Sequence, residues 1–202
     1  MVFHINGVLL RMSFSFNNMI WSPVDYAEAS VLAREVGDEM LSRLEWMTLK
    51  PRVIVDAGCG TGEMSERLQK RYPDAHVTAL DLSEDMVQHA THNSCVCADA
   101  GYLPLPSQSV DLLFANFLLP WQANIEPMLR EWRRVLRPDG LLIFSAFGPD
   151  TLREWQTFVE RDDMPAFIDM TDAIVFNTKS MCSSFAVIVV ARNPVTPSVA
   201  SE

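Results

Sequence analysis

The chain has 202 residues, of which 49% are hydrophobic and 21% are charged. This length and balance predict one globular domain with a sizeable core and exclude an intrinsically disordered chain. The net charge of -10 argues against non-specific binding to nucleic acid. Four cysteines are too few for a disulfide scaffold, so we expect reduced thiols and a cytoplasmic location.

The N-terminal region is apolar but carries His4, Asn6 and Arg11, a pattern that does not fit a signal peptide. The apolar run "LLFANFLLPW" at 112–121 is far shorter than the roughly 20 residues of a membrane-spanning helix. We therefore expect no association with a membrane. The expected division of the chain is an N-terminal extension (1–23), one functional domain (24–192) and a disordered tail (193–202).

Helix and strand patterns alternate along the chain. Apolar residues at helical spacing predict an amphipathic helix over 25–47, and a β-branched run predicts a buried strand over 52–56. In chain order there follow helix 61–71, strand 76–80, helix 83–90, strands 95–98 and 110–116, helix 125–136, strand 141–147 and helix 150–159.

Turn signals shape the C-terminal part. The stretch "RPDG" predicts a turn between the helix over 125–136 and the next strand. The segments "AIVF" (173–176) and "SFAVIVVAR" (184–192) predict a hairpin with "NTKS" as its turn. The whole pattern predicts an α/β fold: a doubly wound, mostly parallel sheet with helices on both faces and an antiparallel C-terminal hairpin at its edge.

The first strand ends in "VIVDAGCGTG", where Asp56 precedes glycines at positions 58, 60 and 62. Ligands of doubly wound sheets bind outside the carboxyl ends of the strands, where the strand order reverses. Glycine lets the backbone turn sharply there and lets a ligand approach it closely. Gly58, Gly60 and Gly62 are therefore predicted to line a ligand site.

Three ligands are candidates for this turn. A phosphate-binding P-loop requires Lys and then Ser or Thr after the last glycine, but Glu63 and Met64 follow here. A dinucleotide fingerprint requires a third glycine at position 63, and Asp56 would repel a pyrophosphate. S-adenosylmethionine has no phosphate and carries a sulfonium and an ammonium, so the negative charge of Asp56 favours it.

Polar residues follow the next strands as well. Asp81, with Leu82 beside it, ends the second strand, where a carboxylate can accept hydrogen bonds from both ribose hydroxyls. Asp99, followed by Ala100, is placed to accept from the adenine amino group, and Asn116 to contact the methionine end. Each residue alone also fits a turn cap, but four such residues at successive strand ends favour a cofactor site.

Several stretches resemble class I S-adenosylmethionine methyltransferases. They are "VIVDAGCGTG", "ALDLS", "ADAGYLPLP", "VDLLFAN" and "LRPDGLLIFSAFG". More narrowly, "YAEASVLAREVG", "NFLLPW" and "FGPDTLREW" resemble the malonyl-ACP O-methyltransferases of biotin synthesis. The resemblance covers roughly residues 24–172 and implies a Rossmann-like methyltransferase sheet, S-adenosyl-L-methionine as cofactor, and an acyl carrier protein or small acyl-thioester as substrate.

The resemblance has two departures. Pro120 stands where the family usually has Gln, and after "FIDMTDA" the resemblance stops and the chain ends sooner than family members do. We therefore expect cofactor binding with weak transfer to malonyl-ACP. The "GPDTL" stretch is shared with assembly factors, so a non-catalytic relative that keeps the cofactor fold stays an alternative. A quinone or other small-molecule methyltransferase is another.

The chemistry requires few catalytic groups. A malonyl carboxylate is already ionised at pH 7, so no general base is needed and no catalytic residue is assigned; positioning and water exclusion supply the rate. Tyr26 matches a family tyrosine and is predicted to close over the cofactor, with a half-buried helix tyrosine as the alternative. Trp121 and Arg153 are weaker candidates for the acceptor side.

Two further patterns concern a partner surface and a metal site. Four arginines in "LREWRRVLRP" (Arg130, Arg133, Arg134 and Arg137) form a basic face that fits an acidic carrier protein, but a solvated helix face is favoured. Cys95 and Cys97 lie near two histidines, yet their spacing lacks the paired pattern of zinc sites. No metal is predicted.

Overall fold

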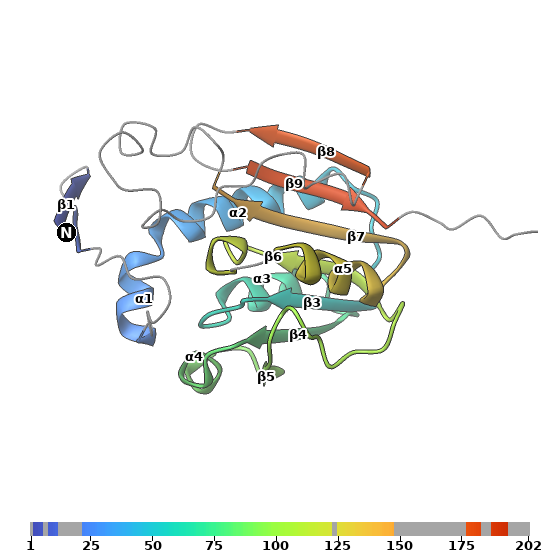
Figure 1. Ribbon diagram of the computed structural model, residues 1–202, viewed down its shortest axis with the longest axis horizontal. Coiled ribbons are helices and arrows are strands. Elements are labelled where there is room, and N and C mark those ends of the chain that lie inside the picture. Colours follow the sequence, from blue (N-terminus) through green and yellow to red (C-terminus); the bar gives the residue numbers. More distant parts are fainter. Residues whose placement is uncertain are drawn as a thin grey trace, which may run out of the picture.

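The computed structural model describes residues 2–5, 8–11, 22–122, 125–147, 177–182 and 187–193. At its centre, the described residues form a seven-stranded sheet in the order β5-β4-β3-β6-β7-β9-β8 (Figure 1). Its strands are β3 (Val53–Ala57), β4 (His76–Asp81), β5 (Cys95–Cys97), β6 (Val110–Ala115), β7 (Leu136–Ala146), β8 (Asn177–Cys182) and β9 (Val187–Arg192). The first five strands in this order are parallel, whereas β9 runs antiparallel to both β7 and β8. The predicted mostly parallel sheet with an antiparallel C-terminal edge is confirmed.

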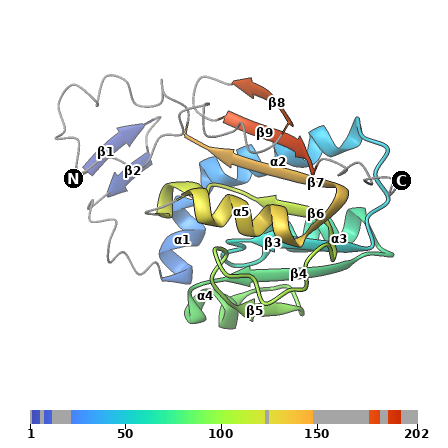
Figure 2. The same cartoon turned by 45° about the vertical axis from the view of Figure 1, so that its right-hand side comes forward.

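Helices cover both faces of this sheet (Figures 1 and 2). They are α1 (Pro23–Ala29), α2 (Val31–Glu45), α3 (Glu63–Arg71), α4 (Glu84–His89) and α5 (Ile125–Val135), with a short 3-10 helix, η1, at Leu119–Trp121. On one face α2 and α3 bury Met40 and Leu68 in a cluster with Phe114 of β6. On the other, α5 buries Trp132 in a cluster with Leu113. Neighbouring residues of β6 thus point to opposite cores, as expected of a strand buried on both sides.

The strand order reverses beside β3. The chain passes from β3 outward to β4 and β5 and then returns to β6 on the other side of β3. The parallel register pairs Asp56 of β3 with Ala79 of β4 and with Phe114 of β6. The carboxyl ends of β3, β4 and β6 therefore share one edge of the sheet, where the glycine turn begins.

The single helix predicted over 25–47 is wrong in one respect: it is two helices. Ser22 caps α1 by accepting a hydrogen bond from the Asp25 N–H, and Pro23 fills the first turn, so the helix begins earlier than predicted. Ser30 separates α1 from α2, with its hydroxyl donating to the Ala27 carbonyl. This local side-chain bond competes with continued helix and lets α1 take its own direction.

Two predicted turns lie inside strands instead. Helix α5 leads directly into β7, and "RPDG" is a bulge in that strand, with Asp139 at φ 63° and a register shift opposite β6. Strand β8 contains "NTKS", because Asn177 pairs with Arg192 and Cys182 with Val187. Pairing with β9 overrides the turn preference of these polar residues. Segments 173–176 and 150–159 and the tail 194–202 lie outside the described residues.

The N-terminal extension carries two strands that the sequence did not predict, β1 (Val2–Ile5) and β2 (Val8–Arg11), which pair antiparallel in a separate two-stranded sheet (Figure 2). Among the described residues, no helix combines the length and apolar character needed to cross a membrane.

Candidate functional site

The glycine turn after β3 is built on left-handed backbone. Gly58, Gly60 and Gly62 have φ of 72°, 55° and 80°, a region that residues with a Cβ rarely adopt. The Gly58 and Cys59 N–H groups both donate to the Leu80 carbonyl of β4. The turn is therefore fixed against the end of the neighbouring strand and presents backbone to the space above the sheet.

Asp81 holds this turn from the end of β4. One carboxylate oxygen accepts from the Gly60 N–H at 2.9 Å, and the other accepts from the Ser83 N–H at 2.9 Å. Ser83 in turn caps α4 by accepting from the Met86 N–H. A carboxylate oxygen has two lone pairs, so each Asp81 oxygen still has one acceptor position for a ligand hydroxyl.

Asp56 lies at the end of β3 and is only 2% exposed. The Ser65 hydroxyl, from the first turns of α3, donates to its carboxylate at 2.5 Å. Burial raises the pKa of Asp56 to about 7, the Ser65 hydrogen bond opposes this rise, and the charge of Asp81 adds to it. A buried acid in this state gains from a cation placed beside it.

Tyr26 of α1 lies against the glycine turn. A Cβ added to Gly60 would come within 2.9 Å of the Tyr26 ring, so the two are already in contact. Burial, followed by the charges of Asp56 and Asp81, raises the pKa of the Tyr26 hydroxyl to about 12. A neutral phenol thus covers the turn, and closure over a ligand stays a prediction.

The loop after β5 carries Asp99 and Ala100. One Asp99 carboxylate oxygen accepts from the Gly101 N–H at 2.7 Å. Within the part of the chain that the structure describes, the second oxygen, Oδ2, and the Ala100 N–H make no hydrogen bond. The loop therefore offers one acceptor and one donor side by side. Leu82, 68% exposed after β4, adds an apolar surface.

Asn116, predicted to face the methionine end of a ligand, is tied into the protein. Its side-chain amide donates to the Ala33 carbonyl of α2 at 2.7 Å, and its oxygen accepts from the Ser145 hydroxyl at 2.6 Å. Ser145 also accepts from the Phe117 N–H. Asn116 therefore attaches α2 to the ends of β6 and β7, with its second amide N–H left as the group that can face a ligand.

The acceptor-side candidates are only partly placed. Trp121 lies in η1 and is 42% exposed, whereas Arg153 lies outside the described residues. Arg137 of the predicted basic face lies in β7 and not in α5. The face is largely neutralised: Arg130 pairs with Glu126, Arg134 with Glu131, and Arg137 with Asp111. This pairing favours a solvated helix face over a docking surface for an acidic protein.

Three cysteines are free thiols: Cys59, Cys95 and Cys97. Burial is the main cause that raises the pKa of the Cys59 thiol, so this residue is a poor nucleophile. The Cys95 thiol lies against the His92 carbonyl. No group of three or more metal-ligating side chains occurs among the residues that the structure describes.

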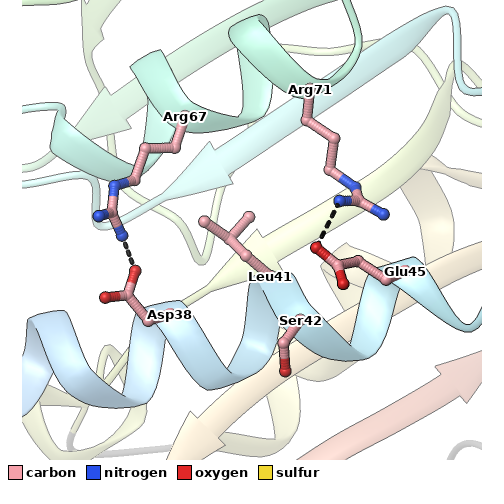
Figure 3. A pocket seen from close by; sticks show the side chains of 6 residues that line it. All are labelled: Asp38, Leu41, Ser42, Glu45, Arg67 and Arg71. Carbon is pink, nitrogen blue, oxygen red and sulfur yellow. Dashed lines mark hydrogen bonds and ion pairs between the residues drawn. The ribbon is translucent and has the colours of Figure 1, made fainter.

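A groove of about 310 Å³ lies elsewhere, between α2 and α3 (Figure 3). Arg67 pairs with Asp38 across it, and Arg71 pairs with Glu45 at 3.4 Å. Both cations are already matched by carboxylates, and the groove opens on the outer face of the helices rather than at the strand ends. It joins two helices and offers no convergent reactive groups.

Comparison with known proteins agrees with this geometry. Residues 55–144, which run from β3 to β7, match a family model described as a methyltransferase domain. This segment is similar to that family. It contains the glycine turn, Asp81 and Asp99, whereas Tyr26 lies before it.

Curated relatives extend the match over more of the chain. The malonyl-[acyl-carrier protein] O-methyltransferase of Methylovorus sp. is 37% identical over 164 residues, which cover 73% of this chain and 55% of the relative. Its counterpart in Halorhodospira halophila is 39% identical over 158 residues, covering 73% and 54%. The chain spans about half the length of these curated relatives.

Solved structures share the fold. A SAM-dependent methyltransferase from Aquifex aeolicus superposes with a TM-score of 0.62 at 20% identity, covering 86% of this chain and 99% of the other. The plantazolicin methyltransferase BpumL, in a complex that contains SAH, superposes with a TM-score of 0.68 at 14% identity, covering 84% and 87%. These likenesses confirm the predicted doubly wound, Rossmann-like fold.

Sequence reasoning missed three residues that support the site: Ser65, Trp132 and Ser145. Ser65 lies in a helix nine positions after Asp56, a separation with no recognisable motif. Trp132 and Ser145 act on residues about 30 positions away. Only Trp132 carried a signal, since a buried indole N–H requires a partner.

Proposed function

We propose that this chain binds S-adenosylmethionine at the glycine turn and methylates the free carboxylate of a malonyl-thioester, with malonyl-acyl carrier protein as its substrate. The observation that carries this proposal is the buried carboxylate of Asp56 directly before a glycine turn held by Asp81. This arrangement suits a ligand with positive charge and ribose hydroxyls, not a phosphate. The relatives in Methylovorus and Halorhodospira are named malonyl-[acyl-carrier protein] O-methyltransferases, which supports this acceptor.

The residues of the site fit the cofactor group by group. The open lone pairs of Asp81 suit the two ribose hydroxyls. The Asp99 carboxylate oxygen and the Ala100 N–H match the amino group and ring nitrogen on one edge of adenine, with Leu82 as the adjacent apolar surface. A Cβ at Gly60 would reach the Tyr26 ring, so the close approach of Tyr26 to the turn depends on glycine at this position.

The methionine end meets the remaining residues. Asp56 supplies the negative charge for the cationic part of the cofactor, and Gly58 and Gly62 complete the backbone wall. Asn116 contributes its remaining amide N–H. These assignments, together with Tyr26 as a cover, make up the proposed cofactor site.

Catalysis then requires orientation more than proton transfer. S-adenosylmethionine supplies an electrophilic methyl group. The acceptor carboxylate is ionised at neutral pH, so the chain needs no base, and no side chain is proposed as catalytic. Tyr26 and α1 exclude water above the turn, which strengthens the attraction between opposite charges in the closed site. Positioning accounts for the rate.

Two further properties belong to the proposal: the cellular location of the protein and the bounds of its functional unit. We propose a cytoplasmic enzyme, in keeping with the free thiols of the described residues, and a methyltransferase unit that spans 24–192. The basic face predicted in "LREWRRVLRP" gives little support to docking of a carrier protein there, because three of its four arginines are paired.

The test measures binding and transfer on one preparation. Calorimetry should show binding of S-adenosylhomocysteine and none of NAD. Transfer of labelled methyl from S-adenosylmethionine to malonyl-acyl carrier protein should follow, with acetyl-acyl carrier protein, which lacks the free carboxylate, as the matched control. Tight NAD binding without a response to S-adenosylhomocysteine would contradict the cofactor. Binding without transfer to any malonyl-thioester would favour a non-catalytic relative or another small-molecule acceptor.

A further inference from the structure

The indole N–H of Trp132 donates to the Ala100 carbonyl at 3.0 Å. Trp132 is fully buried in α5 and Ala100 is 5% exposed, so this bond lies away from water. A buried hydrogen bond of this kind is costly to lose, because the carbonyl has no solvent to replace its partner.

The same peptide group is held from its other side. The carbonyl of Ala100 and the N–H of Gly101 belong to one peptide plane. The Trp132 indole donates to the oxygen of this peptide, while the N–H of the same peptide, on Gly101, donates to Asp99 Oδ1 at 2.7 Å. A continuous chain of hydrogen bonds therefore runs from the Trp132 indole through one peptide to the Asp99 carboxylate. Such chains reinforce each bond in them.

Helix α5 also fixes the far end of this loop. Glu131 accepts from the Leu103 N–H at 2.9 Å, and Arg134 donates to the Leu105 carbonyl at 2.9 Å. The hydrogen bond from Arg134 lowers the pKa of the Glu131 carboxyl, which stays charged as an acceptor. Helix α5 is itself packed on the sheet through Trp132 and Met128. The position of the loop is therefore set by helix α5.

We infer that Trp132 is a positioning residue for base recognition: through the Ala100–Gly101 peptide it sets Asp99 Oδ2 and the Ala100 N–H against the edge of an adenine. This inference rests on the proposed cofactor site. Trp132 does not touch the ligand itself. It decides how strictly the site distinguishes adenine from a base with the opposite donor and acceptor pattern.

Hypoxanthine is the informative competitor. It replaces the amino group of adenine by a carbonyl and carries N–H at the adjacent ring nitrogen. The carbonyl, an acceptor, then faces the acceptor oxygen of Asp99. The ring N–H, a donor, faces the N–H donor of Ala100. The parent protein should therefore bind S-adenosylhomocysteine more tightly than S-inosylhomocysteine by at least about tenfold, since a site built to hydrogen-bond one group rejects its mismatch.

The experiment compares Trp132→Phe with Phe144→Leu. Trp132→Phe removes the N–H but keeps an aromatic ring, whereas Phe144→Leu disturbs the ring that packs edge-on against Trp132 at 6.2 Å and keeps the N–H. Both variants should melt earlier than the parent. Only Trp132→Phe should reduce the preference for S-adenosylhomocysteine, by about fivefold to tenfold, as expected from one lost hydrogen bond in the chain.

The outcomes separate the proposed function from the role of Trp132. Failure of the parent to bind S-adenosylhomocysteine would overturn the proposed function. Binding with an unchanged base preference in Trp132→Phe, or an equal loss in Phe144→Leu, would overturn the role of Trp132 alone. If Trp132→Phe does not fold, Glu131→Gln weakens the same loop at Leu103 and should lower the preference by about twofold to threefold; no change in that variant would also overturn the inference.

Discussion

The Ser65 hydroxyl lies 2.5 Å from the Asp56 carboxylate and donates a hydrogen bond to it. Ser65 is fully buried and Asp56 is 2% exposed. Among the described residues, no other side chain hydrogen-bonds this carboxylate. Burial raises the pKa of Asp56 to about 7 and the Ser65 bond resists that rise. The charge at the end of β3 therefore changes near neutral pH.

Cofactor binding should depend on pH through Asp56. A cationic ligand binds the ionised acid better, so the affinity for S-adenosylmethionine should fall as the pH drops through about 7. The affinity can fall by at most about tenfold per pH unit when binding requires one group to lose its proton. Calorimetry at pH 6 and pH 8 measures this, and Asp56→Asn should bind weakly with no pH dependence in this range. Equal affinities of the parent at both values would contradict the prediction.

The stability of the ligand-free protein should follow the opposite trend. The folded protein holds the Asp56 proton more tightly than the unfolded chain, in which this acid has the ordinary aspartate pKa of 3.8. The free energy of unfolding from this group therefore decreases as the pH rises from about 4 through about 7. Thermal melts should show Asp56→Asn to be stabilised relative to the parent at pH 8 but not at pH 4. A constant difference between the two proteins would show that Asp56 does not titrate as expected.

Ser65→Ala should move the pH midpoint of cofactor binding upward. Without the Ser65 hydrogen bond, the ionised form of Asp56 loses its donor while its burial remains. Ser42→Ala, in α2 at the groove away from the strand ends, is the matched control and should keep the parent midpoint. A midpoint that stays in place or moves downward in Ser65→Ala would rule out this role of the serine.

Asp81→Ala should weaken binding of S-adenosylhomocysteine by about 1–3 kcal/mol. The ribose loses a charged acceptor, and the Gly60 and Ser83 N–H groups lose the oxygens that hold the turn and the start of α4. Asp85→Ala, on the exposed first turn of α4, changes the charge equally and should bind like the parent. The same affinity in both variants would mean that the ribose site lies elsewhere.

Gly60→Val should impair both folding and binding. A branched residue at φ 55° is strained by roughly 1–2 kcal/mol or more, and its Cβ would meet the Tyr26 ring at 2.9 Å. Adding Tyr26→Ala relieves the contact but not the backbone strain. Thermal melts of the single and double variants should therefore show partial recovery. Full recovery of the melting temperature would mean that the contact with Tyr26 causes all of the destabilisation. No recovery would mean that the backbone strain causes it.

Much of the site was predictable because it is local in sequence. Strands of the parallel sheet are continuous apolar runs, and each ends where a polar residue can meet solvent or ligand. The glycine turn requires left-handed backbone at positions that only glycine fits well. The ten consecutive residues "VIVDAGCGTG" are therefore enough to predict it. This pattern predicted the positions of Asp56, Asp81 and Asp99. In the structure all three lie at or just after the carboxyl ends of strands, at one edge of the sheet.

What the sequence alone determined is thus the alternation of strands and helices, the glycine turn and the acids that follow the strands, since each depends on neighbours in the chain. Tertiary structure decided the rest. Asn116 contacts Ala33 across 83 positions, Trp132 contacts Ala100 across 32, and "NTKS" becomes a strand because β9 lies beside it. A buried polar group must find a partner wherever the fold brings one, and no spacing rule encodes that partner before the chain has packed.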